Sequence, residues 1–288
     1  EAIDYLLKPI DTDDLADTIT KIKKHISKGF NAEKFEDILL KFNNKLHNKK
    51  IIKDIHMYNR DYLSNESSQY TQESSKAELM SFLKATYQLF AGSLLAATAG
   101  AYIGLEIVSY LMGPMKWILF GIELALIFFV IPRTKHIPGV NLAVLFGFTF
   151  ISGLTIAPLL AAIFAMPAGA SIVGQAFLMT SVAFGGISMF AMTTKRDFSN
   201  MGKFLFIALI IMIVGGISNI FIQSSMFQLV IASAGALLFS AFILYDTQQI
   251  IRGGYDSPID AALSLYLDFF NLFISLLQIL GIMNSNDD

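Results

Sequence analysis

The feature that most constrains this fold is a succession of long apolar stretches beyond residue 89. Seven of them are candidate membrane spans: residues 90–112, 117–131, 140–163, 170–192, 204–222, 227–246 and 261–283. A helix needs roughly 20 apolar residues to cross ~30 Å of hydrocarbon, and the second stretch reaches that length only with its flanking residues. Buried helices of a soluble protein are the alternative, but so many apolar stretches with such short links disfavour it. The pattern predicts an all-α membrane protein with seven transmembrane helices.

Charge divides the chain into two unlike parts. Most charged side chains fall within the first 80 residues, whereas the whole chain is 54% apolar with a net charge of −2. We therefore expect a soluble segment (1–56), a polar linker (57–80) and a transmembrane domain (81–288). The net charge argues against a nucleic-acid partner. The chain has no cysteine, so it has no disulfide and no thiolate metal site.

The soluble segment has a pattern of its own. A Lys8-Pro9 pair follows an apolar run, and Leu15, Ile19, Ile22 and Ile26 then form a stripe at helical spacing. Residues 1–28 resemble the C-terminal end of a response-regulator receiver domain, a strand followed by a helix. So short a piece cannot bury a core alone. We interpret the segment as a fused remnant, with a further helix behind it, that contributes nothing to transport; an unrelated helical hairpin is the alternative.

Basic residues predict the orientation of the spans. If the spans alternate, one side of the membrane receives seven basic residues and the other receives only Lys116; the seven are Lys84, Arg133, Lys135, Lys195, Arg196, Lys203 and Arg252. Cytoplasmic loops carry such an excess. We expect a cytoplasmic N-terminus and a location in a bacterial inner membrane, with the lipid bilayer as partner.

Small residues on the first span predict close helix packing. Gly92, Ala96, Gly100 and Gly104 recur every four residues and therefore lie on one face. Ridges of this kind let two membrane helices approach closely. An Ala/Gly-rich composition without a packing role is the alternative.

Two aspartates lie where a membrane protein tolerates them least. Asp246 is near the end of the sixth stretch and Asp268 is inside the seventh, at depths of roughly 6 Å and 12 Å from the helix rise. A carboxylate at such depth costs several kcal/mol on most scales and is usually functional. The short connecting loop makes the two helices antiparallel neighbours, so the carboxyl groups can meet.

A meeting of the two carboxyl groups predicts a pH sensor. Two carboxylates in a low dielectric cannot both ionise freely, so we expect them to share a proton. Asp246 and Asp268 would also supply oxygen ligands to a hard cation such as Ca²⁺. Ser264 and Asn271 flank Asp268 at helical spacing and are expected to add hydrogen bonds. The alternative is that each aspartate snorkels to the surface or caps a helix end.

The last two stretches carry a recognisable pattern. ILYDTQQI, followed by ALSLYLDFFNLFISLLQILGI, resembles the last two spans of the Bax inhibitor-1 family. FLKATYQLFAGSLLAATAGAYIG resembles the first span of bacterial members, and GFTFISGLTIAP the third. The resemblance extends over residues 57–288.

The resemblance implies six helices around a central, polar seventh helix. It also implies a pH-sensitive calcium leak channel gated by an aspartate pair, which maps onto Asp246 and Asp268. The family acid in helix two corresponds to Glu123, a candidate pore residue. An arginine at the cytoplasmic end of that helix holds the pair closed in such members. Arg133 is the nearest match and the candidate latch, although Thr134 holds the expected position.

Two other functions remain open. A proton-coupled cation transporter fits the same residues, with Ca²⁺ and H⁺ as substrates. An intramembrane aspartyl protease would also use two aspartates on consecutive helices, but its Gly-x-Gly-Asp signature is missing, since Leu265-Tyr266-Leu267 precedes Asp268. We therefore expect no enzyme activity and no bound cofactor, with Ca²⁺ as a permeant ion and H⁺ as the regulator. The sequence identifies no protein partner.

Overall fold

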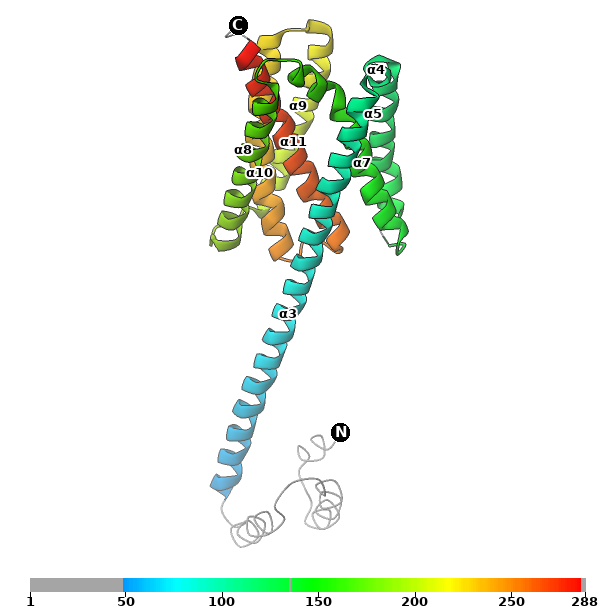
Figure 1. Cartoon of the computed structure of the whole chain (residues 1–288). Coiled ribbons are helices and arrows are strands. Elements are labelled where there is room, and N and C mark those ends of the chain that lie inside the picture. Colours follow the sequence, from blue (N-terminus) through cyan, green and yellow to red (C-terminus); the bar gives the residue numbers. More distant parts are fainter. Residues whose placement is uncertain (1–48, 135, 286–288) are drawn as a thin grey trace. The chain divides into compact units, whose positions relative to one another are not determined.

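The computed structural model describes residues 49–134 and 136–285, with side chains from residue 76 onward. All seven expected spans are present, and no strand occurs in the described part of the chain (Figure 1). The predicted receiver remnant at 1–28 and the rest of the chain up to residue 48 lie outside the described residues. The chain is thus an integral membrane protein, and its described part is all-α.

The spans follow one another with short connections. The first is the part of α3 (Lys49–Glu106) from Lys76 onward. The second joins α4 (Val108–Tyr110), η2 (Leu111–Met115), α5 (Lys116–Ala125), η3 (Leu126–Val130) and α6 (Ile131–Thr134). The others are α7 (Val140–Phe164), α8 (Gly169–Thr193), η4 (Ser199–Met201) with α9 (Gly202–Ile222), α10 (Ser225–Ile251) and α11 (Pro258–Ser285).

The border between the first two spans differs from the prediction, which extended the first span to residue 112. The chain leaves helical geometry at Ile107 (φ −110°, ψ 22°), so the second span starts at Val108. The predicted break lies inside that span, where Gly113 is non-helical (φ −86°, ψ −149°) and precedes Pro114. Proline removes a helix donor and kinks a helix without ending the span.

The predicted linker at 57–80 is also helical. α3 runs through it without interruption. The chain has neither glycine nor proline between Gly29 and Gly92, so its polar composition contains no residue that breaks a helix. The chain divides into two compact units at Gln72 and Glu73, and the second unit holds every span.

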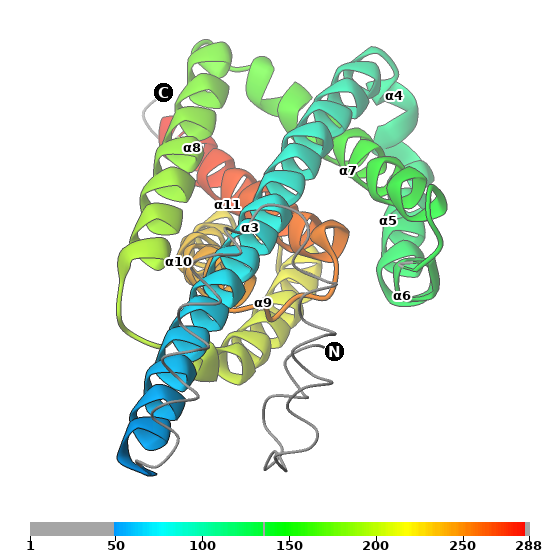
Figure 2. The same ribbon diagram turned by 90° about the horizontal axis from the view of Figure 1, so that it is seen from below.

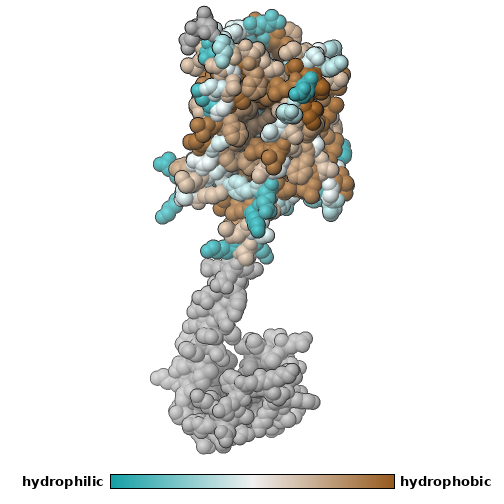
Figure 3. All heavy atoms as spheres, in the orientation of Figure 1, coloured by the Kyte–Doolittle hydropathy of each residue, from teal (hydrophilic) through white to brown (hydrophobic). Residues whose placement is uncertain are grey.

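α11 is the central helix of the membrane domain, as expected. It packs against α10, α8 and α7, and Figure 2 shows it passing between α8 and α10 on one side and α7 on the other. Its side chains Leu265, Tyr266 and Leu272 are almost completely buried. Most large side chains on the outer helices are instead apolar and exposed, among them Phe221 and Leu237 (Figure 3). Such a surface matches hydrocarbon rather than water.

The small-residue ridge of α3 faces α7. A Cβ atom on Gly100 would overlap the backbone carbonyl of Phe150, and one on Gly104 would overlap Ala157. The same holds for Gly153 of α7, where a Cβ atom would overlap the backbone carbonyl of Ala97. The ridge is therefore a packing surface, because the two backbones approach more closely than any side chain allows.

Candidate functional site

Asp246 and Asp268 are both buried in the membrane domain. The predicted stretch ended at residue 246, whereas α10 continues to Ile251. Asp246 therefore lies five residues inside the helix. Asp246 is 7% exposed and Asp268 is 4% exposed. Neither side chain reaches the surface, which removes the alternative that they snorkel.

The structure brings the two carboxyl groups together. α10 and α11 are antiparallel neighbours, and the side chains of Asp246 and Asp268 are hydrogen-bonded to each other. A carboxylate has no donor of its own, so such a bond needs a proton between the two groups. The second oxygen of Asp268, Oδ2, is buried without a hydrogen-bond partner. The pair is therefore a compact acid site with one unsatisfied oxygen.

Tyr255 completes the site from outside both helices. Its hydroxyl is hydrogen-bonded to Asp246 and to Ser264. Burial, and then the adjacent Asp246, raise the pKa of Tyr255 above its usual range. The hydroxyl therefore keeps its proton and donates to Asp246, while the Ser264 hydroxyl donates to Tyr255. Sequence reasoning missed this tyrosine; the signal was its place in the short loop between the two aspartates.

The backbone of that loop is fixed at both ends. After α10, the Gly253 N–H donates to the Ile250 carbonyl (3.3 Å) and the Gly254 N–H to the Gln249 carbonyl (2.7 Å). With Gly253 at φ +72°, this is the Schellman pattern, which needs glycine because of its left-handed conformation. At the other end, Ser257 Oγ accepts from the Ile259 N–H (3.2 Å) at the start of α11.

The two residues expected to support Asp268 have other partners. Ser264 bonds to Tyr255, and the Asn271 amide donates to the Leu267 carbonyl of its own helix (2.8 Å). The expected hydrogen bonds from these side chains to Asp268 are therefore not formed, and its Oδ2 has no partner. Helical spacing placed Ser264 and Asn271 near Asp268, but both donate to other acceptors.

The candidate latch lies away from the aspartate pair. Arg133 is exposed and donates through Nη1 to the Phe129 carbonyl of its own segment (2.8 Å). The structure thus does not bring Arg133 to the aspartates, in contrast to the expected latch. The cause is its position: Thr134, one residue later, is half-buried and lines a small pocket with Asp260 of α11, whereas Arg133 faces outward.

Glu123 belongs to a second polar cluster. Its carboxyl group is hydrogen-bonded to Ser152 and Thr155 of α7. Ser152 is also hydrogen-bonded to Tyr266, whose hydroxyl donates weakly to the Thr149 carbonyl (3.4 Å). Tyr266 and Asp268 are two residues apart on α11 and so point to opposite sides. The central helix therefore has one polar site on its α10 side and another on its α7 side.

The α8–α9 loop is tied to the end of α10 beside the pair. The Gln248 amide clamps the loop backbone, accepting from Phe198 N (3.0 Å) and donating to the Arg196 carbonyl (2.7 Å). Arg252 forms an ion pair with Asp197 and donates to Ser199 Oγ (3.2 Å). The hydrogen bond from Arg252 lowers the pKa of Asp197 below its usual range. Two loops that carry basic residues thus meet at one end of the bundle.

The identity of the fold follows from comparison with known proteins. Residues 79–285 match the family described as "Inhibitor of apoptosis-promoting Bax1". The match begins inside the first span, contains the other six and includes both aspartates. The chain belongs to the Bax inhibitor-1 family.

Relatives of this Bax inhibitor-1 chain occur in bacteria and in a virus. An uncharacterised protein of Campylobacter jejuni is 51% identical over 80% of this chain and 99% of its own length. An uncharacterised membrane protein of Vibrio cholerae is 41% identical over 71% of this chain and 91% of its own. A Golgi anti-apoptotic protein of vaccinia virus is 36% identical over 71% of this chain and 86% of its own.

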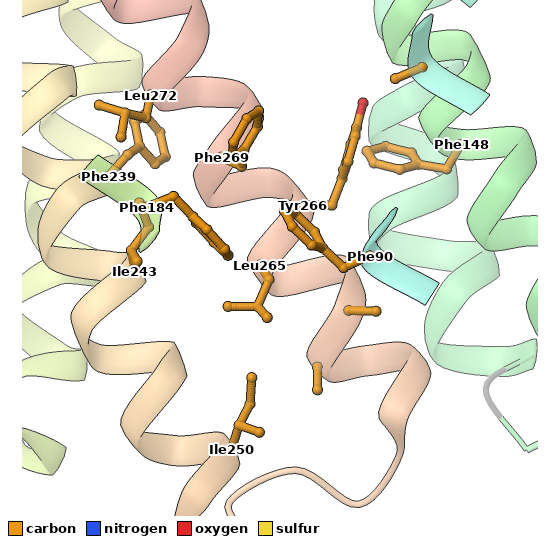
Figure 4. Packing of buried hydrophobic residues seen from close by; sticks show 13 residues of the cluster. Phe90, Phe148, Phe184, Phe239, Ile243, Ile250, Leu265, Tyr266, Phe269 and Leu272 are labelled. Atoms are coloured by element: carbon orange, nitrogen blue, oxygen red, sulfur yellow. The ribbon is translucent and has the colours of Figure 1, made fainter. Parts of the chain in front are cut away.

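Beyond the pair, the Bax inhibitor-1 core is aromatic. Phe90 of α3 stacks on Phe184 of α8 at a centroid distance of 4.9 Å. Both rings also make T-shaped contacts with Phe269, the residue after Asp268, at centroid distances of 5.8 and 5.6 Å (Figure 4). No group of three or more acidic or histidine side chains that could hold a metal ion occurs among the described residues. The acid site thus consists of two carboxyl groups beside an aromatic layer.

Proposed function

We propose that this chain is a pH-sensitive calcium leak channel whose gate is the pair Asp246–Asp268. The observation that carries the proposal is the hydrogen bond between two buried carboxyl groups on adjacent helices. That bond exists only while a proton is shared, so the α10–α11 contact depends on pH. Membership of the Bax inhibitor-1 family supports a role in the membrane.

Loss of the shared proton is the proposed opening step. Two carboxylates left in a medium of low dielectric repel each other, and each needs water that the closed core excludes. α10 and α11 would then separate until water reaches the pair. Protonation shifts this equilibrium by no more than the difference in proton affinity between the closed and open states.

Calcium is the proposed substrate rather than a resident ligand. Two carboxylates supply at most four oxygens, whereas Ca²⁺ takes six to eight. A passing ion would keep part of its water shell and exchange the rest at Asp246 and Asp268. We propose no enzymatic role, since the glycine-containing signature of aspartyl proteases is missing before Asp268.

We also propose that the end of the bundle with Arg252 is cytoplasmic and that the membrane is the bacterial inner membrane. The ion pair of Arg252 with Asp197 supports this, because it joins two loops that carry basic residues. The chain lacks cysteine, so Lys195→Cys in the α8–α9 loop and Gln223→Cys in the exposed α9–α10 turn would each introduce a single thiol. We expect a membrane-impermeant maleimide to label Gln223→Cys in intact spheroplasts and Lys195→Cys only in inverted vesicles. The reverse pattern would reverse the topology.

The function is tested by calcium flux in proteoliposomes that contain a calcium dye, across a series of pH values. We expect flux to rise as pH rises. Asp246→Asn should weaken this dependence and lower the apparent affinity for Ca²⁺, because one anionic oxygen ligand is lost. An internal pH dye separates the alternative, since a proton-coupled transporter moves protons with each cation and a leak does not. Flux independent of pH in the unmodified protein would contradict the proposal.

A further inference from the structure

A pocket opens beside the loop that connects α10 and α11. Its volume is about 340 Å³, and it is lined by Glu78 and Phe82 of α3 and by Ile250, Arg252 and Tyr255 around the loop. The pocket lies at the end of the bundle where the α8–α9 loop is also tied down. It is large enough for a hydrated cation and several further water molecules.

Tyr255 belongs both to this pocket and to the acid site. Its side chain lines the pocket, and its hydroxyl is hydrogen-bonded to Asp246. Asp246 itself is only 7% exposed and is not among the lining residues. Tyr255 therefore links the pocket to the first carboxyl group of the pair.

The backbone around Tyr255 offers little freedom. The hydrogen bonds donated by the Gly253 and Gly254 N–H groups, and the cap by Ser257, fix the loop on either side of the tyrosine. Movement that uncovers Asp246 is therefore a rotation of the Tyr255 side chain, not an opening of the loop. That rotation breaks two hydrogen bonds, one to Asp246 and one to Ser264.

The charges at the pocket favour a cation. Arg252 lines the pocket, but its guanidinium is paired with Asp197 and also bonds to Ser199. Glu78 of α3 also lines the pocket and is exposed. An entering cation thus meets a carboxylate and a neutralised arginine.

We propose that Tyr255 is the gate residue between this pocket and the aspartate pair, and that a cation reaches Asp246 only by displacing the tyrosine hydroxyl. The hydroxyl and the cation compete for the same carboxylate oxygens. The ring closes the path, and the hydrogen bonds to Asp246 and Ser264 hold it closed. The choice of calcium as the cation rests on the proposed function; the closure of the path does not.

The test uses the absence of cysteine in this chain. Asp268→Cys places one thiol behind Tyr255, and its reaction with a small cationic methanethiosulfonate added from the Arg252 end reports access. In this background, Tyr255→Phe keeps the ring and loses both hydrogen bonds, whereas Tyr255→Ala also removes the ring. We expect the rate to rise about tenfold in Tyr255→Phe, the equivalent of ~1.4 kcal/mol for the two hydrogen bonds together, and further in Tyr255→Ala.

Tyr245→Phe is the matched control. Tyr245 is also half-buried and adjoins Asp246 in sequence, but its ring lies at Gly202 of α9. We expect its labelling rate to equal that of the parent. If Tyr255→Ala fails to fold, the labelling rate of Tyr255→Phe alone tests the gate. Equal rates for parent and Tyr255→Phe would overturn the gate.

Calcium flux in proteoliposomes separates this inference from the proposed function. With Asp268 intact, we expect Tyr255→Phe and Tyr255→Ala to raise flux at the pH where the unmodified protein is closed. Faster labelling without calcium flux in any variant would retain the gate and reject the calcium leak. Normal flux in the unmodified protein together with unchanged labelling would reject the gate alone.

Discussion

Replacing Asp268 by asparagine is expected to abolish the pH dependence of calcium flux. The amide of asparagine donates a hydrogen bond to Asp246 at every pH, as the protonated acid does only at low pH. The closed contact between α10 and α11 then no longer depends on a proton. We expect flux in Asp268→Asn to stay near the low-pH value of the unmodified protein throughout the titration, measured in proteoliposomes with a calcium dye.

The size of the effect follows from linkage. A hundredfold difference in proton affinity between closed and open states corresponds to ~2.7 kcal/mol and changes their ratio about a hundredfold. Asp256→Asn is the matched control, because it removes one carboxylate from the exposed loop at the same end of the bundle. An unchanged pH profile in Asp268→Asn would show that the pair has a structural role only.

Replacing Gly100 by leucine is expected to prevent stable packing of α3 on α7. Even a Cβ atom at this position would overlap the Phe150 carbonyl, which belongs to a helix backbone and cannot move aside. The loss of folding stability should therefore exceed the ~1–3 kcal/mol that is typical of an overpacked core. We expect little or no monodisperse protein in detergent by size-exclusion chromatography, and a sharply lower thermal midpoint for what remains.

Gly186→Leu provides the comparison for this packing prediction. Gly186 lies in the middle of α8, and a Cβ atom there meets nothing within 4 Å. The two variants introduce the same side chain into a membrane helix, so they differ only in what it meets. If both were equally stable, the close approach of α3 and α7 would contribute nothing to stability.

The acid site and the packing surface have complementary roles in the proposed gating. α3 packs tightly on α7 through Gly100 and Gly153, while its Phe90 meets the aromatic layer next to Asp268. In the proposed gating, a rigid outer contact and a pH-dependent inner contact would allow α10 and α11 to move without loss of the fold. The tie between Gln248 and the α8–α9 loop would carry that loop with the end of α10.

The sequence alone determined the fold class and the pair. Length and hydropathy predict the spans because hydrocarbon imposes one helix length on any chain that crosses it. The same constraint made Asp246 and Asp268 conspicuous, since few residues pay so large a desolvation cost as a carboxylate. A short loop then implied that the two helices are neighbours. The sequence also predicted the small-residue ridge of α3, because its four-residue spacing is close to one turn of an α-helix.

Only the tertiary structure decided which polar groups meet across helices. Tyr255 lies in a loop, where no periodic pattern indicates its direction, and the turn at Gly253 places its hydroxyl on Asp246. Ser264 has the spacing of a partner for Asp268 but bonds to Tyr255 instead. Arg133 and Thr134 are adjacent in sequence, yet rotation of about 100° per residue around a helix separates an exposed side chain from one beside α11. Hydropathy predicts which segments lie in the membrane. The hydrogen-bond partners of a polar side chain depend instead on the rotation and register of each helix, which only packing fixes.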